Sequence, residues 1–463
     1  MLPTMPEATV YRTDLDPLGE VRVAVEALHG PQTERACTNF PLSGVPVAAI
    51  EPLLAALAQV KKAAAITNVE IGDLSPTKGA AIVAACDEIL AGGLREHFCV
   101  DVCQGGAGTS TNMNANEVIA NRALQLLGFA PGRYDVLHPN DDVNRNQSTN
   151  DAYATAVRLA VHAMNAPLVV ALERLAAAFE AKAEQFRSVV KLGRTQLQDA
   201  VPITLGAELG AYATTLREDA ARAGELVRLF LEVNIGGTAV GTGIAAHPLY
   251  RARIGAQLAE TTGLPVTIAE NLIEATWDMG AFVLYSGLLK RIAAKLSKIS
   301  NDLRLLSSGP SGGLGEITLP KRQPGSSIMP GKVNPVIPEA MSAIAYRVFG
   351  LDLTITFAAE AGQLQLNPFE PVICWSLHEA VTLLTRGMDM LAEHCVEGIE
   401  AVEWRCRDNL LRSTALATEL VPRIGYARAA AVAMHAQQFG DLAASVTLLE
   451  PEMVPVLQEL LIQ

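Results

Sequence analysis

The sequence predicts a mainly α-helical protein whose centre is a bundle of long helices, and three observations support this prediction. Half of its 463 residues are apolar but only 5% are aromatic, which suits packed helices better than an all-β sandwich. Long segments with few Gly or Pro residues follow one another from residue 150 onward: 151–187, 204–234, 270–307 and 336–400. In the third segment, apolar residues recur every three or four positions, close to the α-helical period: Leu284, Leu288, Ile292, Leu296, Ile299, Leu303 and Leu306.

The order of these segments predicts three domains. Residues 1–145 mix short helical segments with Gly-rich turns, residues 146–400 hold the long helices, and residues 401–463 are more charged and are broken by Pro and Gly. A helix of about 35 residues would be roughly 50 Å long, so the central domain should be an elongated bundle. Its Ala- and Leu-rich faces exceed what one core needs, which favours helices shared between the subunits of an oligomer.

Charge and composition limit the class of partner. The formal net charge is −13 and no cluster of Lys and Arg is present, which argues against a nucleic-acid partner but allows a local cationic pocket for a small anion. The start of the chain has acidic residues and no apolar run, so we expect no signal peptide. Apolar runs such as Val169–Leu175 are short and flanked by charges, so we expect no membrane span and a cytoplasmic location.

Three polar clusters interrupt the apolar chain near predicted helix starts. Residues 105–114 place glycines and hydroxyls where a helix begins, residues 146–151 precede a long helix, and residues 193–199 precede a helix expected to start near Pro202. Free backbone N–H groups at helix starts attract carboxylates. Helix capping or a polar surface would explain the first cluster, and a charged interhelix loop the third, but six consecutive polar residues in the second exceed what capping needs.

Residues 325–335, with the sequence GSSIMPGKVNP, form the most informative cluster. Its Gly and Pro residues resist helix and strand, so we expect a loop. The loop carries two adjacent hydroxyls (Ser326 and Ser327), one cation (Lys332) and one amide (Asn334), a combination that suits chemistry on a small carboxylate. The Gly- and Ser-rich segment 305–315 before it favours a lid that orders over substrate, although a flexible surface loop would share this composition.

The histidines and cysteines form no recognised catalytic or metal-binding motif. The eight histidines are isolated from the clusters, and no HExxH, Walker or dinucleotide-binding fingerprint is present. Cys99 and Cys103 lack a second Cys or His pair nearby, so we expect no metal site and seven reduced thiols in or near the core. The residues alone therefore predict acid–base chemistry, without a metal or organic cofactor, on a small anionic substrate.

Taken together and in this order, the four clusters resemble the aspartase/fumarase superfamily. The loop 325–335 matches the signature of that superfamily without substitutions, and the resemblance extends from about Asp16 to about Gly440. Within the superfamily the sequence is more similar to the aspartase branch. Thr149 stands where fumarases usually have Ser and Gln196 where they usually have His, whereas residues 236–243 resemble fumarases.

The resemblance implies a mainly α, three-domain protomer whose central long-helix bundle forms a homotetrameric core, with each active site shared among three subunits. It implies a cofactor-independent elimination of ammonia from L-aspartate that gives fumarate through an aci-carboxylate intermediate. Ser326 would be the base that removes the C3 proton. The implied substrate-binding residues are Thr109, Ser148, Thr149, Asn150, Thr195, Gln196, Ser327, Lys332 and Asn334.

Some positions depart from the pattern of the superfamily. Ser311 stands where relatives commonly have Arg, and residues 367–371 and 421–425 also differ. None of these is an implied substrate-binding position, but Ser311 removes a cation close to the lid and leaves the physiological substrate open. The alternatives are a class II fumarate hydratase, a lyase for an N-substituted C4 dicarboxylate, and a catalytically silent helical scaffold.

Overall fold

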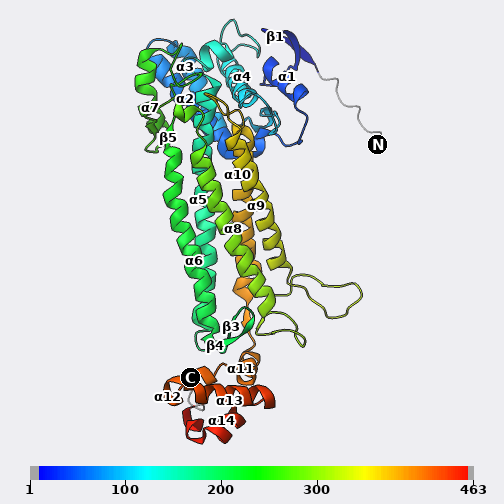
Figure 1. Ribbon diagram of the computed structural model, residues 1–463. Helices are drawn as coiled ribbons and strands as arrows, with labels where there is room; N and C mark the ends of the chain where they lie inside the picture. Colours follow the sequence, from blue (N-terminus) through cyan, green and yellow to red (C-terminus); the bar gives the residue numbers. More distant parts are fainter. Residues whose placement is uncertain (1–9, 457–463) are drawn as a thin grey trace, which may run out of the picture. The chain divides into compact units, whose positions relative to one another are not determined.

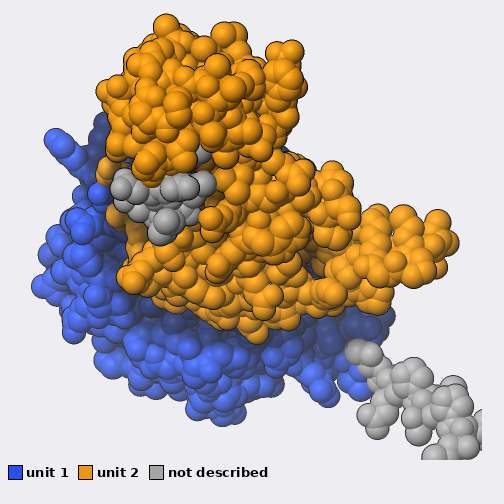
Figure 2. Space-filling model, turned by 90° about the horizontal axis from the view of Figure 1, so that it is seen from below, with its two compact units in different colours: residues 1–166, 223–289, 350–382 blue, residues 167–222, 290–349, 383–463 orange. Residues whose placement is uncertain are grey.

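The computed structural model describes residues 10–456, which form two units built from interleaved parts of the chain. The first unit comprises 10–166, 223–289 and 350–382, and the second comprises 167–222, 290–349 and 383–456 (Figure 2). Residues 1–9, on which the signal-peptide prediction depends, and residues 457–463, the end of the predicted third domain, lie outside the described residues. The predicted division at 145 and 400 stays a prediction.

The prediction of a mainly α-helical fold is confirmed. The five longest helices occupy the segments expected from the scarcity of Gly and Pro (Figure 1): α5 (Thr149–Gln185), α6 (Leu205–Leu226), α8 (Gly280–Leu306), α9 (Val336–Glu360) and α10 (Glu370–His394). The segment 336–400 thus holds two helices. The chain turns between them because the Asn367 amide donates to the carbonyls of Ala358 (2.9 Å) and Ala359 (3.1 Å), at the end of α9.

The apolar stripe of α8 packs as its spacing predicts. Its members from Leu288 to Leu306 are buried, since each exposes 5% or less of its surface. Leu284 is the exception, with 52% of its surface exposed. Helical spacing therefore identified the buried face of α8 but not the point at which that face becomes exposed.

The first unit carries shorter elements around its parts of the long helices. They are β1 (Tyr11–Asp16), β2 (Gly19–Ala24), α1 (Pro31–Asn39), α2 (Glu51–Glu70), α3 (Pro76–Leu90), α4 (Thr109–Leu126), α7 (Pro248–Thr262), β5 (Glu232–Val233) and β6 (Thr267–Ile268). Strands β1 and β2 pair antiparallel, and β5 and β6 pair parallel. The buried carboxylate of Glu117, in α4, accepts hydrogen bonds from the backbone N–H groups of Gly30, Gln32 and Thr33. These are free donors at the start of α1, so Glu117 fixes that helix against α4.

The second unit adds a hairpin and a group of short helices at the end of the chain. They are β3 (Val190–Thr195), β4 (Gln198–Thr204), β7 (Ile317–Thr318), β8 (Glu400–Ala401), α11 (Glu403–Arg412), α12 (Ala417–Ile424), α13 (Tyr426–Phe439) and α14 (Leu442–Leu449). The short helices pack around a common apolar core that includes Leu420, Val432 and Val446, and Leu192 of β3 joins it.

The prediction of a helix starting near Pro202 was wrong. Pro202 lies in β4, which pairs antiparallel with β3, and α6 begins at Leu205. The cluster 193–199 is therefore a β-hairpin and not an interhelix loop. Gln196 and Leu197 form its tip with φ of 53° and 62°, the backbone conformation that a tight two-residue hairpin turn requires.

A buried ionic cluster joins the hairpin to the segment before the predicted lid. The carboxylate of Glu316, which is fully buried, forms ion pairs with Lys191 (3.0 Å) and Arg194 (2.8 Å) of β3, and the Asn409 amide donates to it from α11. Burial by itself would raise the pKa of the Glu316 carboxyl, but the hydrogen bond from Arg194 and the charge of Lys191 outweigh burial and the pKa is lowered. Glu316 is therefore a charged anchor inside the unit.

Within residues 10–456, two helices are long and apolar enough to cross a membrane by length and composition alone. They are α5 and α9, and 67% of the apolar window of α5 is buried within the protein, compared with 39% for α9. Burial of this extent is typical of the core helix of a globular protein, so α5 is weak support for a membrane span. The larger exposed share of α9 leaves an apolar helix face uncovered within one copy of the chain.

We predict that replacing Glu316 with Gln destabilises the fold. The change removes the counter-charge of Arg194 and one of the two carboxylates that pair with Lys191, which keeps its ion pair with Glu208 (2.7 Å). Breaking a buried ion pair costs about 3 kcal/mol or more of unfolding free energy. Because the folded-state pKa of Glu316 is lowered, its contribution is fully present above the unfolded pKa of about 4.3 and disappears as the pH falls through the folded pKa. Urea unfolding of both proteins at several pH values measures this difference.

The exposed pair Arg217–Glu180 (2.9 Å) provides the matched control. Glu180→Gln should change the unfolding free energy by about 0.5 kcal/mol or less, because solvent screens such pairs. Equal losses of unfolding free energy in the two variants would show that Glu316 contributes no more to stability than an exposed ion pair does.

Candidate active site

The ten residues singled out by the sequence fall into two groups. Four lie in the first unit and six in the second. The first group comprises Thr109, Ser148, Thr149 and Asn150, and the second comprises Thr195, Gln196, Ser326, Ser327, Lys332 and Asn334.

In the first unit, two of the predicted clusters meet at the starts of α4 and α5. Gly108 precedes α4 with φ of 82°, and a Cβ there would lie 2.3 Å from the ring of Tyr153, on α5. Only glycine allows this close approach. Asn112, in the first turn of α4, then donates its amide to the hydroxyl oxygen of Thr149 at 3.0 Å. Glycine in the first cluster thus brings the second cluster into contact with α4.

A buried carboxylate holds residues 148–150 in place. Asp151 accepts from the backbone N–H of Ser148 through one oxygen (2.8 Å), and from those of Gly236 and Thr238 through the other (3.0 and 2.9 Å). The Asn150 amide donates to the carbonyl of Ala239 at 2.7 Å. The start of α5 is therefore fastened to the segment 236–239, and its polar side chains have fixed positions.

The hydroxyl groups of Ser148 and Thr149 can donate hydrogen bonds to a ligand. Asn112 donates to the Thr149 oxygen, and the backbone N–H of Asn150 donates to the Ser148 oxygen at 3.3 Å. Across residues 10–456, no protein acceptor is recorded for the hydroxyl hydrogen of either residue. A hydroxyl that already accepts can still give its hydrogen to a ligand oxygen, which suits a carboxylate. Asn150 uses its N–H₂ group on Ala239 and keeps its amide oxygen as an acceptor.

Sequence reasoning missed Lys61, a fully buried cation beneath this group. Its ammonium donates to the side-chain oxygens of Asn144 and Gln147, each at 2.9 Å, and Asn144 in turn accepts from Asn112 at 3.3 Å. Burial lowers the pKa of Lys61 to about 7, against the opposing charge of Asp151. Lys61 therefore supports the segment that leads into Ser148.

A sequence signal for Lys61 existed. It lies in α2 between Leu54, Leu57, Ala58 and Ala64, which are all buried, at helical spacing from each of them. A lysine in register with an apolar stripe has to be buried and paired. The sequence does not show which acceptors pair with it, because Asn144 and Gln147 are more than 80 positions away.

In the second unit, residues 325–335 form a loop without helix or strand, as predicted (Figure 1, before α9). The half-buried Ser326 places its hydroxyl oxygen at the backbone N–H groups of Ile328 (3.2 Å) and Met329 (3.0 Å). Two N–H donors at one hydroxyl oxygen stabilise the negative charge that the oxygen gains when it loses its proton. The structure thus gives Ser326 an environment that favours the alkoxide.

The loop closes on itself next to Ser326. The backbone N–H of Gly325 donates to the carbonyl of Lys332 at 3.0 Å, and the Asn334 amide donates to the carbonyl of Gly325 at 3.1 Å. A Cβ at Gly325 would lie 2.4 Å from the Lys332 carbonyl oxygen, so the closure requires glycine. The side chains of Ser327 and Lys332 are exposed and available to a ligand.

The remaining two residues, Thr195 and Gln196, are exposed at the tip of the β3–β4 hairpin. Within the described part of the second unit, no hydrogen bond joins them to the loop 325–335. Within the first unit, the structure therefore brings Thr149 to α4. Within the second unit, it brings Asn334 next to Ser326, through the carbonyl of Gly325.

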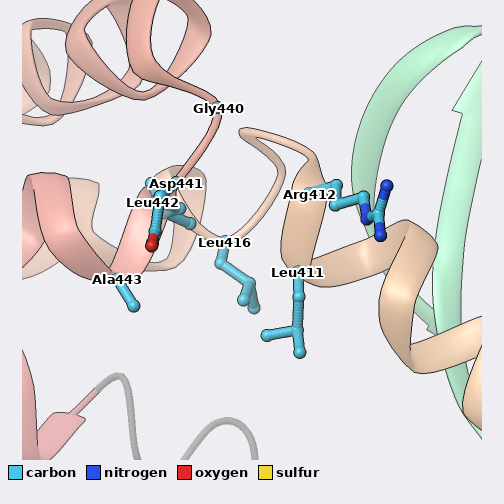
Figure 3. A pocket seen from close by; sticks show the side chains of 7 residues that line it. All are labelled: Leu411, Arg412, Leu416, Gly440, Asp441, Leu442 and Ala443. Carbon is cyan, nitrogen blue, oxygen red and sulfur yellow. The ribbon is translucent and has the colours of Figure 1, made fainter.

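A separate cavity of about 280 Å³ lies among the short helices near the end of the chain (Figure 3). Its lining includes Leu411, Leu416 and Leu442, with Arg412 and Asp441 as the charged residues. It contains none of the predicted site residues. Between residues 10 and 456, no group of three or more His, Cys, Asp and Glu side chains is arranged to hold a metal ion.

Comparison with known proteins decides the family. A family model described as a lyase matches residues 19–350. This chain belongs to the aspartase/fumarase superfamily. An aspartate ammonia-lyase of Pseudomonas canavaninivorans is 56% identical to this chain, over 94% of this chain and 92% of its own length. An aspartate ammonia-lyase of Escherichia coli K12 is 49% identical over 90% and 87% of the two chains.

Solved structures of superfamily members agree with this assignment. A fumarate lyase:delta crystallin from Brucella melitensis, bound to cobalt, is 55% identical with a TM-score of 0.95, covering 98% of this chain and 99% of that one. A class II fumarase from Schistosoma mansoni is 34% identical with a TM-score of 0.90, covering 95% of each chain. The predicted superfamily and its mainly α fold are confirmed.

We predict that Lys61 makes the stability of this protein depend on pH. Between about 7, its pKa when folded, and 10.5, its ordinary value, the unfolded chain binds a proton that the folded protein does not. The unfolding free energy must therefore rise with pH in this window, by about 1.4 kcal/mol per pH unit. In denaturant titrations, Lys61→Met should lose this slope relative to the parent protein.

The neighbouring Lys62, which pairs with Asp87 at the surface, supplies the control. A Lys62→Met variant controls for the loss of one positive charge from α2. Parallel pH profiles for the parent and Lys61→Met proteins would refute a lowered pKa at Lys61.

Proposed function

We propose that this chain catalyses the reversible deamination of L-aspartate to fumarate and ammonia as a carbon–nitrogen lyase. The observation that carries the proposal is the hydroxyl of Ser326, which lies in an irregular loop and faces two backbone N–H donors. The similarity to aspartate ammonia-lyases over at least 90% of the chain supports the choice of substrate.

Ser326 would act as the base that removes the C3 proton. A serine hydroxyl is a poor base in water, but the N–H groups of Ile328 and Met329 stabilise its alkoxide, and closure of the loop over substrate would exclude water. Proton transfer from C3 turns the alkoxide back into a hydroxyl. The electron pair of the C3–H bond then moves into the adjacent β-carboxylate, which becomes an aci-carboxylate dianion.

The donors of the first unit suit that dianion. Thr109, at the positive end of the α4 helix dipole, would bind the β-carboxylate together with Ser148, Thr149 and Ser327. The hydroxyls of Ser148 and Thr149 already accept hydrogen bonds from nitrogen groups and can donate to the carboxylate oxygens. These donors stabilise the developing charge more than the charge of the ground state, which is what lowers the barrier.

The other end of the substrate would be held by Thr195, Lys332 and Asn334 at the α-carboxylate. Asn150, with Thr109, would lie near the substrate amino group, and the amide oxygen of Asn150 would accept from the ammonium. As the C–N bond breaks, the aci-carboxylate returns its electrons to form the C2–C3 double bond and ammonia leaves with its own three protons. Gln196 is a neutral amide and would position substrate without carrying a proton.

The direct test is a fumarate-release assay on the purified protein with L-aspartate, L-malate and N-substituted aspartates. We expect fumarate from L-aspartate, and a fall of about 10³-fold in kcat for Ser326→Ala because the base is lost. The melting temperature should remain nearly unchanged because the loop lies outside the core. Ser327→Ala is the matched control, with a KM roughly tenfold higher from the loss of one hydrogen bond to a charged group.

Each alternative function has a distinct outcome in this assay. Fumarate from L-malate but none from L-aspartate would indicate a fumarate hydratase, and turnover of an N-substituted aspartate alone would indicate the other lyase. No turnover of any substrate would indicate a silent scaffold. Normal activity of Ser326→Ala would remove Ser326 as the base.

The exposed apolar face of α9 supports a homotetramer whose active sites are shared among three subunits. Tyr346, Leu353 and Phe357, at helical spacing, expose 60%, 56% and 65% of their surfaces. An apolar helix face of this kind needs a partner, and equivalent helices of other subunits would cover it. Assembly would also explain why the predicted site residues come from well-separated segments, since different subunits would supply them.

We predict that Phe357→Asp weakens the tetramer, because a carboxylate would have to be buried without a counter-charge. Size-exclusion chromatography with light scattering should show four copies for the parent protein and smaller species for the variant, together with loss of lyase activity. Leu448→Asp, at a residue of α14 that is 66% exposed, is the control and should remain tetrameric. A monomeric parent protein with full activity would contradict the shared site.

A further inference from the structure

Two cysteines and a histidine meet in the first unit, at the end of α1 and the segment leading into α4. The sulfur atoms of Cys37 and Cys99 are 3.5 Å apart, and Nδ1 of His29 is 3.7 Å from the sulfur of Cys99. Both thiols are free and half-buried, so small oxidants can reach them. None of these residues belongs to the proposed substrate-binding set.

The histidine is held as a base toward Cys99. Its Nε2 lies 2.8 Å from a carboxylate oxygen of Glu34. The carboxylate can only accept, so Nε2 carries the ring proton and Nδ1 presents its lone pair to the thiol. Glu34 lies in α1, whose start is fixed by Glu117, and this holds the pair in place.

The two thiols differ in their chemistry. The hydrogen bond from Cys99 lowers the pKa of the Cys37 thiol, against the effect of burial, which raises it. The same contact, together with burial, raises the pKa of Cys99. With Cys99 as the donor in the contact between the two sulfurs, Cys37 carries the thiolate, which is the nucleophilic form. Cys99 keeps its proton until a base removes it.

We propose that Cys37 and Cys99 form a redox-active dithiol that reduces a hydroperoxide and closes to an intramolecular disulfide. Cys37 is the attacking sulfur, Cys99 is the resolving sulfur, and His29 is the base for Cys99. The site is independent of the proposed lyase reaction, because it requires no dicarboxylate and no residue of the loop 325–335.

The reaction balances in two steps. The Cys37 thiolate attacks one oxygen of the peroxide, the O–O bond breaks, and the released hydroxide takes up a proton to give water and Cys37 sulfenic acid. Cys99 then gives its proton to His29 and attacks the Cys37 sulfur, so that the S–S bond forms and the S–O bond breaks. The departing hydroxide takes the proton from His29 as water. Two thiols lose two electrons in total, and hydrogen peroxide, the simplest hydroperoxide, is reduced to two waters.

Disulfide closure requires a small movement. The sulfurs must approach from 3.5 Å to about 2.0 Å. Cys37 lies in the last turn of α1, a nine-residue helix that ends at Asn39, and a rotation of its side chain with a slight shift of this turn can supply the approach. Cys103 is the contrast: it is also half-buried and free, but no sulfur or histidine partner is recorded for it among residues 10–456.

The test treats the reduced, full-length protein with hydrogen peroxide, blocks the remaining thiols with N-ethylmaleimide, and analyses tryptic peptides by mass spectrometry. We expect the peptide with Cys37, residues 36–61, to be linked to the peptide with Cys99, residues 96–122, with a mass lower by two hydrogen atoms. Dithiothreitol should restore both thiols. Cys103 shares the second peptide, so the assay is repeated in Cys103→Ser, where the link should persist.

Three variants separate the roles. Cys37→Ser and Cys99→Ser should each abolish the link without changing the melting temperature of the reduced protein. In Cys99→Ser, Cys37 should accumulate as a sulfenic acid that dimedone traps, because no resolving thiol remains. In His29→Asn, the link should form about tenfold more slowly, since the base for Cys99 is lost.

Two results would overturn the proposal. One is maleimide labelling of both Cys37 and Cys99 after peroxide treatment. The other is oxidation of these cysteines no faster than that of Cys103, with sulfinic or sulfonic acid as the product. Both results can be read whether or not the protein turns over L-aspartate, so failure here and failure of the proposed lyase function are distinguishable.

Discussion

The buried carboxylate of Glu316 fixes the two segments of the second unit that carry the proposed substrate groups. Its ion pairs with Lys191 and Arg194 hold β3, whose hairpin ends at Thr195 and Gln196. Glu316 also directly precedes β7, after which the chain enters the loop with Ser326. A charge inside a protein is tolerated when it is paired and hydrogen-bonded, and the Asn409 amide completes that requirement. Two segments that share no ladder of hydrogen bonds thus acquire fixed positions from one side chain.

In the first unit, a buried carboxylate and a buried amine likewise hold irregular segments in place. Asp151 ties the start of α5 to residues 236–238, and Lys61 supports the preceding turn through Asn144 and Gln147. Irregular backbone lacks the repeating bonds of helix and sheet, so its polar groups need individual partners. Buried polar anchors provide these partners, and they leave the hydroxyls of Ser148 and Thr149 free to donate outward. Because these anchors are rigid, the two hydroxyls keep fixed positions and can donate hydrogen bonds to a bound carboxylate.

Much of the fold follows from patterns within single segments. The spacing of Leu288, Ile292 and Leu296 identified the buried face of α8, and the Gly and Pro residues of 325–335 identified a loop, because helical period and backbone restriction are local properties. The hairpin at 193–199 was not predicted, because this segment was expected to lead directly into a helix near Pro202. Its turn depends on positive φ at Gln196 and Leu197, which are not residues that usually indicate such a turn.

The sequence by itself determined the family, the long helices and the set of polar clusters, because each is written in consecutive residues. Only the tertiary structure decided how those clusters are supported. It placed the N–H groups of Ile328 and Met329 at the Ser326 oxygen, Lys61 beneath Asn144, and the sulfur of Cys99 beside that of Cys37, 62 positions away. These contacts join groups whose separation along the chain carries no periodic signal, so their chemistry exists only once packing has brought them together.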